Sequence, residues 1–161
     1  MLSTALGGGP SSRLFQQVRE ERGLAYSVYS ATASYADAGT LAVYAGCGPD
    51  RLGEVATVVR GVLADVAANG LTDAELARAR GSLRGGLVLG SEDTPSRMNR
   101  IGRSEVDHGR QRTITESLDR ISAVTGEQVT ALARDLLEQP PVTAVVGPFD
   151  DEDALPSSVR A

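Results

Sequence analysis

The feature that most constrains this chain is that its strand-like segments follow one another instead of alternating with helices. Residues 25–34 are rich in Tyr, Val, Thr and Ser and predict a strand, and residues 40–46 predict a second. Residues 36–39, Ala-Asp-Ala-Gly, predict the turn of an antiparallel pair. A late strand is predicted over residues 142–146. Clustered strands of this kind favour an α+β fold over a doubly wound parallel sheet.

Apolar residues in the rest of the chain recur at helical spacing. Residues 11–22 place Leu14, Phe15 and Val18 on one face and stop at Gly23, which is typical of a helix end. Further helix starts are predicted at Pro49, Thr72, Thr94, Thr115 and Thr125. The second and the last of these are followed three residues later by Glu or Gln, which is the spacing of a capping box.

The length of the chain suits one domain, because 161 residues with 41% apolar side chains can bury a single core. We expect this domain over residues 1–148. From Phe149 onward, the acidic run at 150–153 predicts a flexible tail over residues 149–161. Residues 1–6 look like the last turn of a helix whose earlier part is missing, so we expect an N-terminally truncated fragment.

Charge and hydropathy argue against two classes of partner. The formal net charge of −5 does not suit a chain that mainly binds nucleic acid or an anionic membrane. No apolar run reaches the length of a membrane-spanning helix, and residues 1–6 lack the basic start of a signal peptide. We therefore expect no nucleic acid, no membrane and, by default, a cytoplasmic location.

The chain does not assemble a metal site or a nucleophilic site from its own residues. A hydrolytic zinc site needs three protein ligands, and the chain has one histidine, His108, and one cysteine, Cys47. His108 precedes Gly109, where we expect an exposed helix end, and Cys47 is expected to be a small buried residue at the end of a strand. The Gly-x-Ser-x-Gly elbow and the P-loop are both absent, so Ser11 or Ser12 is more simply the N-cap of its helix.

Two polar features are left as candidates. Gly7, Gly8 and Gly9 precede a helix, and such a run either presents backbone N–H groups to a carbonyl or an anion or serves as a plain flexible connector. Arg19 and Tyr26 are seven residues apart, near a helix end and at the start of a strand. Brought to one rim, they would offer donors to a peptide carbonyl and to an oxyanion. Alternatively, Arg19 complements the helix dipole and Tyr26 packs in the sheet.

The run LGGGPSSRLFQQVREERGLAYSVYS at residues 6–30 resembles the second-half signature of pitrilysin/insulinase-type zinc peptidases. It is closest to the processing-peptidase-like branch of bacteria and mitochondria. The resemblance continues through residues 36–39 and 83–103 and covers the chain to about residue 150. It implies an antiparallel sheet with helices packed on one face, as one of two similar halves that close around a chamber.

The resemblance also implies a division of roles. The first half of such peptidases carries a zinc motif, His-x-x-Glu-His, whereas the second half supplies an Arg and a Tyr, which match Arg19 and Tyr26. Tyr26 would then stabilise the tetrahedral intermediate, Arg19 would hold a substrate carbonyl, and the glycine run 7–9 would guide the peptide. We therefore expect a substrate-binding C-terminal domain of a zinc metalloendopeptidase. It should bind no cofactor itself and be inactive alone, with zinc in the partner half.

Two departures from the family pattern matter. Pro10 follows the glycine run where another residue, often Met, is expected, and the strand that normally precedes the run is missing. The sheet should then expose an edge that can pair with another chain, including in a homodimer. The alternative function is a non-catalytic assembly or peptide-binding subunit of the same fold. Because this chain keeps both Arg19 and Tyr26, the peptidase interpretation is favoured.

Overall fold

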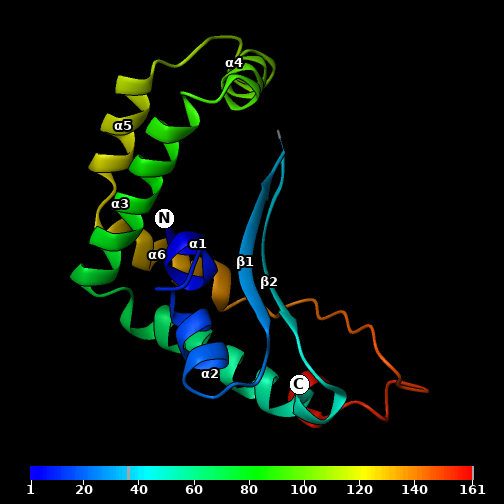
Figure 1. The fold of residues 1–161 in the computed structure, drawn as a ribbon. Coiled ribbons are helices and arrows are strands. Elements are labelled where there is room, and N and C mark those ends of the chain that lie inside the picture. Colours follow the sequence, from blue (N-terminus) through cyan, green and yellow to red (C-terminus); the bar gives the residue numbers. More distant parts are fainter. Residues whose placement is uncertain (36, 161) are drawn as a thin grey trace.

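The computed structural model describes residues 1–35 and 37–160. The chain passes from a short helix through a π-helix into a two-stranded antiparallel sheet and then into a series of helices (Figure 1). This is the α+β arrangement that the clustered strands predicted. In chain order the elements are α1 (Leu2–Gly7), η1 (Phe15–Glu20), β1 (Ser27–Ser34), β2 (Gly39–Gly46), η2 (Pro49–Arg51), α2 (Leu52–Asn69), α3 (Asp73–Gly90), α4 (Thr94–His108), α5 (Ile114–Ala123), α6 (Gly126–Leu137) and α7 (Ser157–Arg160).

The two strands form the predicted hairpin, in which Tyr29 stands opposite Tyr44. The rings of these two tyrosines stack with centroids 5.0 Å apart, a cross-strand contact that holds the register. β1 begins later than predicted, so Tyr26 lies just before the strand and not inside it. The predicted turn includes Ala36, which lies outside the described residues. Pairing of a sheet edge with a second copy of the chain stays a prediction.

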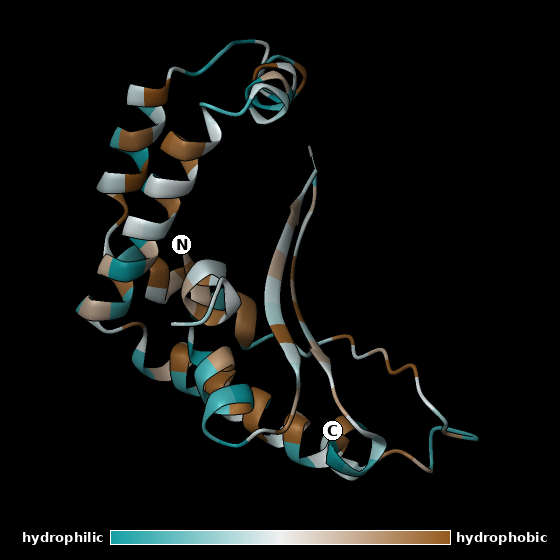
Figure 2. Ribbon diagram, in the orientation of Figure 1, coloured by the Kyte–Doolittle hydropathy of each residue, from teal (hydrophilic) through white to brown (hydrophobic). Residues whose placement is uncertain are grey.

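The helices lie on one side of the hairpin, as expected, and the core lies between them and the sheet (Figure 1). α1 contacts β1 directly, because the Ser30 hydroxyl donates a hydrogen bond of 2.6 Å to the Ser3 carbonyl oxygen. Figure 2 shows that apolar residues alternate with polar ones along the helices. The other face of the hairpin is open, since Tyr29 and Tyr44 are 46% and 50% exposed. The largest fully buried side chains among the described residues are Leu6, Leu14, Val18 and Val66.

A tight corner joins α2 to α3. Gly70 turns the chain with φ of 74°, a conformation that favours glycine. Thr72 and Glu75 then bond reciprocally at the start of α3, which confirms the first capping box. The second capping box is confirmed at the start of α6, where Thr125 and Gln128 bond in the same way.

Two helix starts differ from the prediction. Neither Ser11 nor Ser12 caps the first helical segment, because η1 has no side-chain cap and the Ser12 hydroxyl donates to the Gly9 carbonyl oxygen at 2.6 Å. α5 is capped by Thr113 and not headed by Thr115, since the Thr113 hydroxyl accepts from the Glu116 N–H at 3.1 Å. The spacing from a capping threonine to a Glu three residues later is the signal that identifies the true start.

The late strand predicted over residues 142–146 is wrong. This segment is irregular within the described residues, and Val142 and Val146 are fully exposed. Its valines suit a strand, but a strand forms only where a neighbour accepts its backbone hydrogen bonds. In Figure 1 the segment, in orange, leads from α6 into a long loop that ends at α7.

The end of that loop returns to the body of the protein. Val159 of α7 is buried, the Ser158 hydroxyl donates to the Gly53 carbonyl oxygen at 2.9 Å, and Arg60 donates to the Val159 carbonyl oxygen at 3.3 Å. The division of the chain at residue 148 stays a prediction. Among the described residues, only the bent pair formed by Pro49–Asn69 and Asp73–Gly90, at 104°, has the length and composition to cross a membrane, and no single helix does.

Candidate functional site

Arg19 and Tyr26 come together although they belong to different elements. Arg19 lies in the last turn of η1, and Gly23, with φ of 60°, reverses the chain towards β1. Leu24 and Ala25 are buried and therefore fix the segment that carries Tyr26. The centre of the Arg19 guanidinium lies 4.8 Å from the centroid of the Tyr26 ring, within the range of a cation–π contact.

A third residue, Phe15, completes this arrangement, although its sequence pattern indicated only the apolar face of a helix. The Arg19 guanidinium also lies 4.8 Å from the centroid of the Phe15 ring, so it contacts two aromatic rings. The signal was available, because Phe15 precedes Arg19 by four residues, a spacing that places two side chains on one helix face. Two rings limit the rotation of a side chain that is otherwise flexible.

The pair remains accessible to a ligand. Tyr26 is 83% exposed, so it does not pack in the sheet and that alternative is wrong. The Arg19 side chain is 37% exposed, and its acidic neighbour Glu20 lies 3.8 Å away, a distance longer than a hydrogen bond. The guanidinium N–H groups of Arg19 and the phenolic O–H of Tyr26 are therefore available side by side on the protein surface. Such donors can bind a carbonyl oxygen and a developing oxyanion.

The three glycines of the run differ in whether packing requires glycine at that position. A Cβ on Gly7 would lie 2.2 Å from the Ser30 nitrogen, and one on Gly8 would lie 2.7 Å from the Thr4 carbonyl oxygen. Glycine at these two positions therefore permits close packing of α1 against β1 and of the loop against α1. A Cβ on Gly9 would meet nothing within 4 Å, so packing does not require glycine there.

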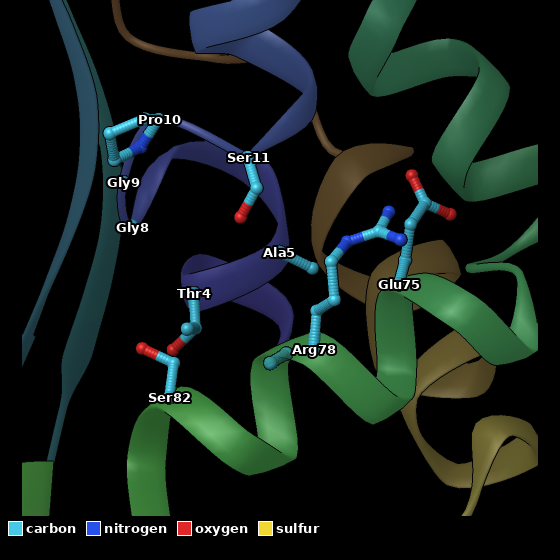
Figure 3. A pocket seen from close by; sticks show the side chains of 10 residues that line it. Thr4, Ala5, Gly8, Gly9, Pro10, Ser11, Glu75, Arg78 and Ser82 are labelled. Carbon is cyan, nitrogen blue, oxygen red and sulfur yellow. The ribbon is translucent and has the colours of Figure 1, made fainter. Parts of the chain in front are cut away.

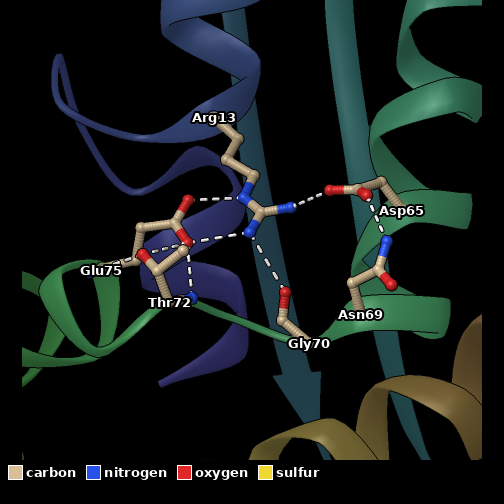
Figure 4. A network of polar contacts seen from close by, with 6 residues as sticks. All are labelled: Arg13, Asp65, Asn69, Gly70, Thr72 and Glu75. Atoms are coloured by element: carbon tan, nitrogen blue, oxygen red, sulfur yellow. Dashed lines mark hydrogen bonds and ion pairs between the residues drawn. The ribbon is translucent and has the colours of Figure 1, made fainter.

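An ion-pair network that no sequence pattern indicated fixes the loop after the glycine run (Figure 4). The Arg13 guanidinium bonds both carboxylate oxygens of Glu75, the Asp65 carboxylate at 2.5 Å and the Gly70 carbonyl oxygen at 3.1 Å. Hydrogen bonding from Arg13 and from Thr72 lowers the pKa of Glu75 to about 2. Arg13 therefore ties the loop to both helices of the α2–α3 corner.

A cavity of about 160 Å³ lies between the glycine run and α3 (Figure 3). Gly8, Gly9 and Ser11 form the loop side, and Arg78 and Ser82 come from α3. No hydrogen bond joins the glycine run to Arg19 or Tyr26 among the described residues; instead the Gln16 amide donates to the Pro10 carbonyl oxygen at 2.7 Å. The structure thus brings Arg19 to Tyr26 and places the glycine run at a separate cavity.

No metal centre is visible in the part of the chain that the structure describes, where no three His, Cys, Asp or Glu side chains are grouped so that they could hold a metal ion. His108 is exposed at the end of α4, as expected. Cys47 is only partly buried, and this burial raises the pKa of its thiol.

Comparisons with known proteins agree with this arrangement. The family described as "Peptidase M16 inactive domain" matches residues 1–83. An uncharacterized zinc protease of Mycobacterium tuberculosis is 55% identical over 161 residues, which is 100% of this chain and 37% of that protein. The zinc protease YmxG of Bacillus subtilis is 40% identical over 92% of this chain and 36% of its own length. The crystal structure of a peptidase M16 inactive domain from Pseudomonas fluorescens has a TM-score of 0.73 at 26% identity, covering 83% of this chain and 32% of that one.

The fold and the match to an inactive-domain family define the class, the non-zinc C-terminal half of a pitrilysin/insulinase-type zinc peptidase. The chain belongs to the peptidase M16 inactive domain family. It spans about 37% of the length of the Mycobacterium tuberculosis relative.

Proposed function

We propose that this chain is the substrate-binding part of a zinc metalloendopeptidase and that Arg19 and Tyr26 act on the peptide at a zinc site carried by another half. The observation that supports the proposal is the exposed contact between Arg19 and Tyr26, in which the guanidinium lies 4.8 Å from the ring centroid. Alone, the chain is then inactive. Its relatives support a second half, because this chain covers only 37% of a protein named as a zinc protease.

The two side chains have distinct roles in this proposal. The Tyr26 hydroxyl donates to the oxyanion of the tetrahedral intermediate, which carries more charge than the substrate carbonyl and so is stabilised preferentially. The Arg19 guanidinium donates to a main-chain carbonyl of the peptide and positions it. Phe15 keeps the guanidinium in place through its ring contact. Zinc in the other half supplies a Lewis acid and an activated water.

The test is cleavage of a quenched fluorescent peptide by the polypeptide that contains both halves, with Tyr26→Phe as the variant. Loss of one preorganised oxyanion donor lowers kcat by about 10²- to 10³-fold. KM should change far less, because the interaction forms mainly in the transition state. Arg19→Lys should raise KM, since lysine cannot keep the planar contact with both rings.

The matched control is Tyr35→Phe, which removes the same hydroxyl from an exposed tyrosine just beyond the end of β1. It should leave kcat and KM unchanged. Peptide cleavage by Tyr26→Phe at the rate of the Tyr35→Phe control would refute the role of Tyr26.

A further inference from the structure

The cavity beside the glycine run is lined by hydrogen-bond donors that the protein itself leaves unused. Arg78 and the hydroxyls of Thr4, Ser11 and Ser82 all line it, and none of these side chains has a hydrogen-bond or ion-pair partner among residues 1–35 and 37–160. Ser12, the neighbour of Ser11, shows the contrast because its hydroxyl is buried and bonded to the loop. Figure 3 shows Arg78 rising from α3 with its guanidinium turned towards Glu75.

The backbone adds two more donors. The N–H groups of Gly9 and Ser11 donate to no acceptor in the described part of the chain, whereas the Gly8 N–H bonds the Thr4 carbonyl oxygen at 3.1 Å. Pro10 between them has no N–H group. A Cβ on Gly9 would meet nothing within 4 Å, so the chain is not crowded at this point of the loop.

The charge around the cavity favours an anion despite the nearby Glu75. Both oxygens of the Glu75 carboxylate accept hydrogen bonds from Arg13, and one of them also accepts from Thr72. Arg13 is itself shared between Glu75 and Asp65. Arg78, by contrast, lines the cavity and forms no ion pair with any residue that the structure describes.

The cavity has room for a small anionic group. Its volume of about 160 Å³ is well above the roughly 10–15 Å³ that one water molecule needs on the same measure, so a carboxylate on a short stem fits. Planar carboxylates match a guanidinium, which can donate two parallel N–H bonds.

We propose that this cavity binds a carboxylate of the peptide substrate, with Arg78 as its main partner and the N–H groups of Gly9 and Ser11 as further donors. The inference rests on the proposed function, because it takes the ligand to be a peptide. The carboxylate belongs either to an acidic side chain or to the C-terminus of the peptide. The chain therefore selects peptides by charge at a place separate from Arg19 and Tyr26.

The experiment measures peptide binding to the polypeptide that contains both halves, after its zinc has been removed by a chelator to prevent cleavage. The probes are labelled ten-residue peptides of Ala, Ser and Val in which a single Glu is moved along the chain, each paired with its Gln counterpart. Every peptide is made with a free and with an amidated C-terminus, and affinity is read by fluorescence anisotropy.

We expect the peptide with Glu at one position, or with a free C-terminus, to bind about tenfold more tightly than its neutral counterpart. This is the gain expected from one charge-assisted contact. Arg78→Gln should remove this difference and leave the affinity of the neutral peptides unchanged. Arg103→Gln removes the same charge from an exposed position on α4 and should keep the difference. The position that responds identifies the source of the carboxylate.

Two results would overturn the inference. Binding without any charge preference, or a preference that survives Arg78→Gln, shows that the cavity does not select a carboxylate, while the proposed function stands. Failure of every peptide to bind, neutral ones included, refutes the proposed function together with the inference, so the two failures are distinguishable.

Discussion

Replacing Gly7 by alanine tests the contact that joins α1 to the sheet. The added Cβ would lie 2.2 Å from the Ser30 nitrogen and 2.7 Å from the Tyr29 carbonyl carbon, so the helix and the strand must move apart. Such overpacking costs about 1–3 kcal/mol. The movement also weakens the hydrogen bond from Ser30 to the Ser3 carbonyl oxygen, which contributes about 1 kcal/mol.

One effect opposes this loss. Alanine favours a helix over glycine by about 1 kcal/mol in the helix interior, and by less at Gly7, the last residue of α1. The clash therefore wins, and the free energy of unfolding should fall by about 1–3 kcal/mol. With a urea slope of about 2 kcal/mol per molar, the middle of the typical range, the midpoint should fall by roughly 0.5–1.5 M.

The assay is urea unfolding followed by circular dichroism, with Gly9→Ala as the matched control. A Cβ on Gly9 meets nothing within 4 Å, and the φ of Gly9 is not positive. The urea midpoint of the Gly9→Ala variant should therefore stay close to that of the original chain. Equal midpoints for Gly7→Ala and Gly9→Ala would refute the close contact between α1 and β1.

Two further substitutions probe the corner and the last long helix. The pKa of Glu75 is about 2, below its ordinary value of 4.5, so the stability it contributes is present above pH 4.5 and is lost as pH falls towards 2. Glu75→Gln should lower the free energy of unfolding by about 1–3 kcal/mol at neutral pH and flatten its dependence on acid pH. Urea midpoints measured between about pH 2 and 7 would show both effects. An unchanged pH dependence would contradict the role given to the Arg13–Glu75 pair. Thr125→Ala should cost about 1 kcal/mol by loss of the cap of α6, whereas Thr143→Ala, in an exposed loop, should cost nothing; thermal unfolding compares the two.

The local signals in this chain predicted the fold well wherever a short segment determines its own conformation. The capping boxes at Thr72 and Thr125 and the helix end at Gly109 are set by side chains within four residues, so they can be read without tertiary information. The strand prediction for residues 142–146 failed because a strand also needs a neighbouring strand to pair with, and β-branched composition cannot supply one. Thr115 failed because Thr113, two positions earlier, has the same side chain and the correct spacing.

The candidate site was predictable in part. The proximity of Arg19 and Tyr26 follows from the glycine break between them, and the structure shows it. The contribution of Phe15 could have been found from its spacing to Arg19. The network around Arg13 could not, because its partners Asp65 and Glu75 are 52 and 62 residues away and only the packing of the helices brings them close.

The docking of α7 on α2 has a consequence for the order of folding. The bond from Ser158 to Gly53 joins residues 105 positions apart, and contacts of such separation form only after a large loss of chain entropy. α7 has four residues and a single buried side chain, Val159, to offset that loss. It should therefore attach last during folding and detach first, as a separate cooperative unit whose amide hydrogens exchange with solvent long before those of α2.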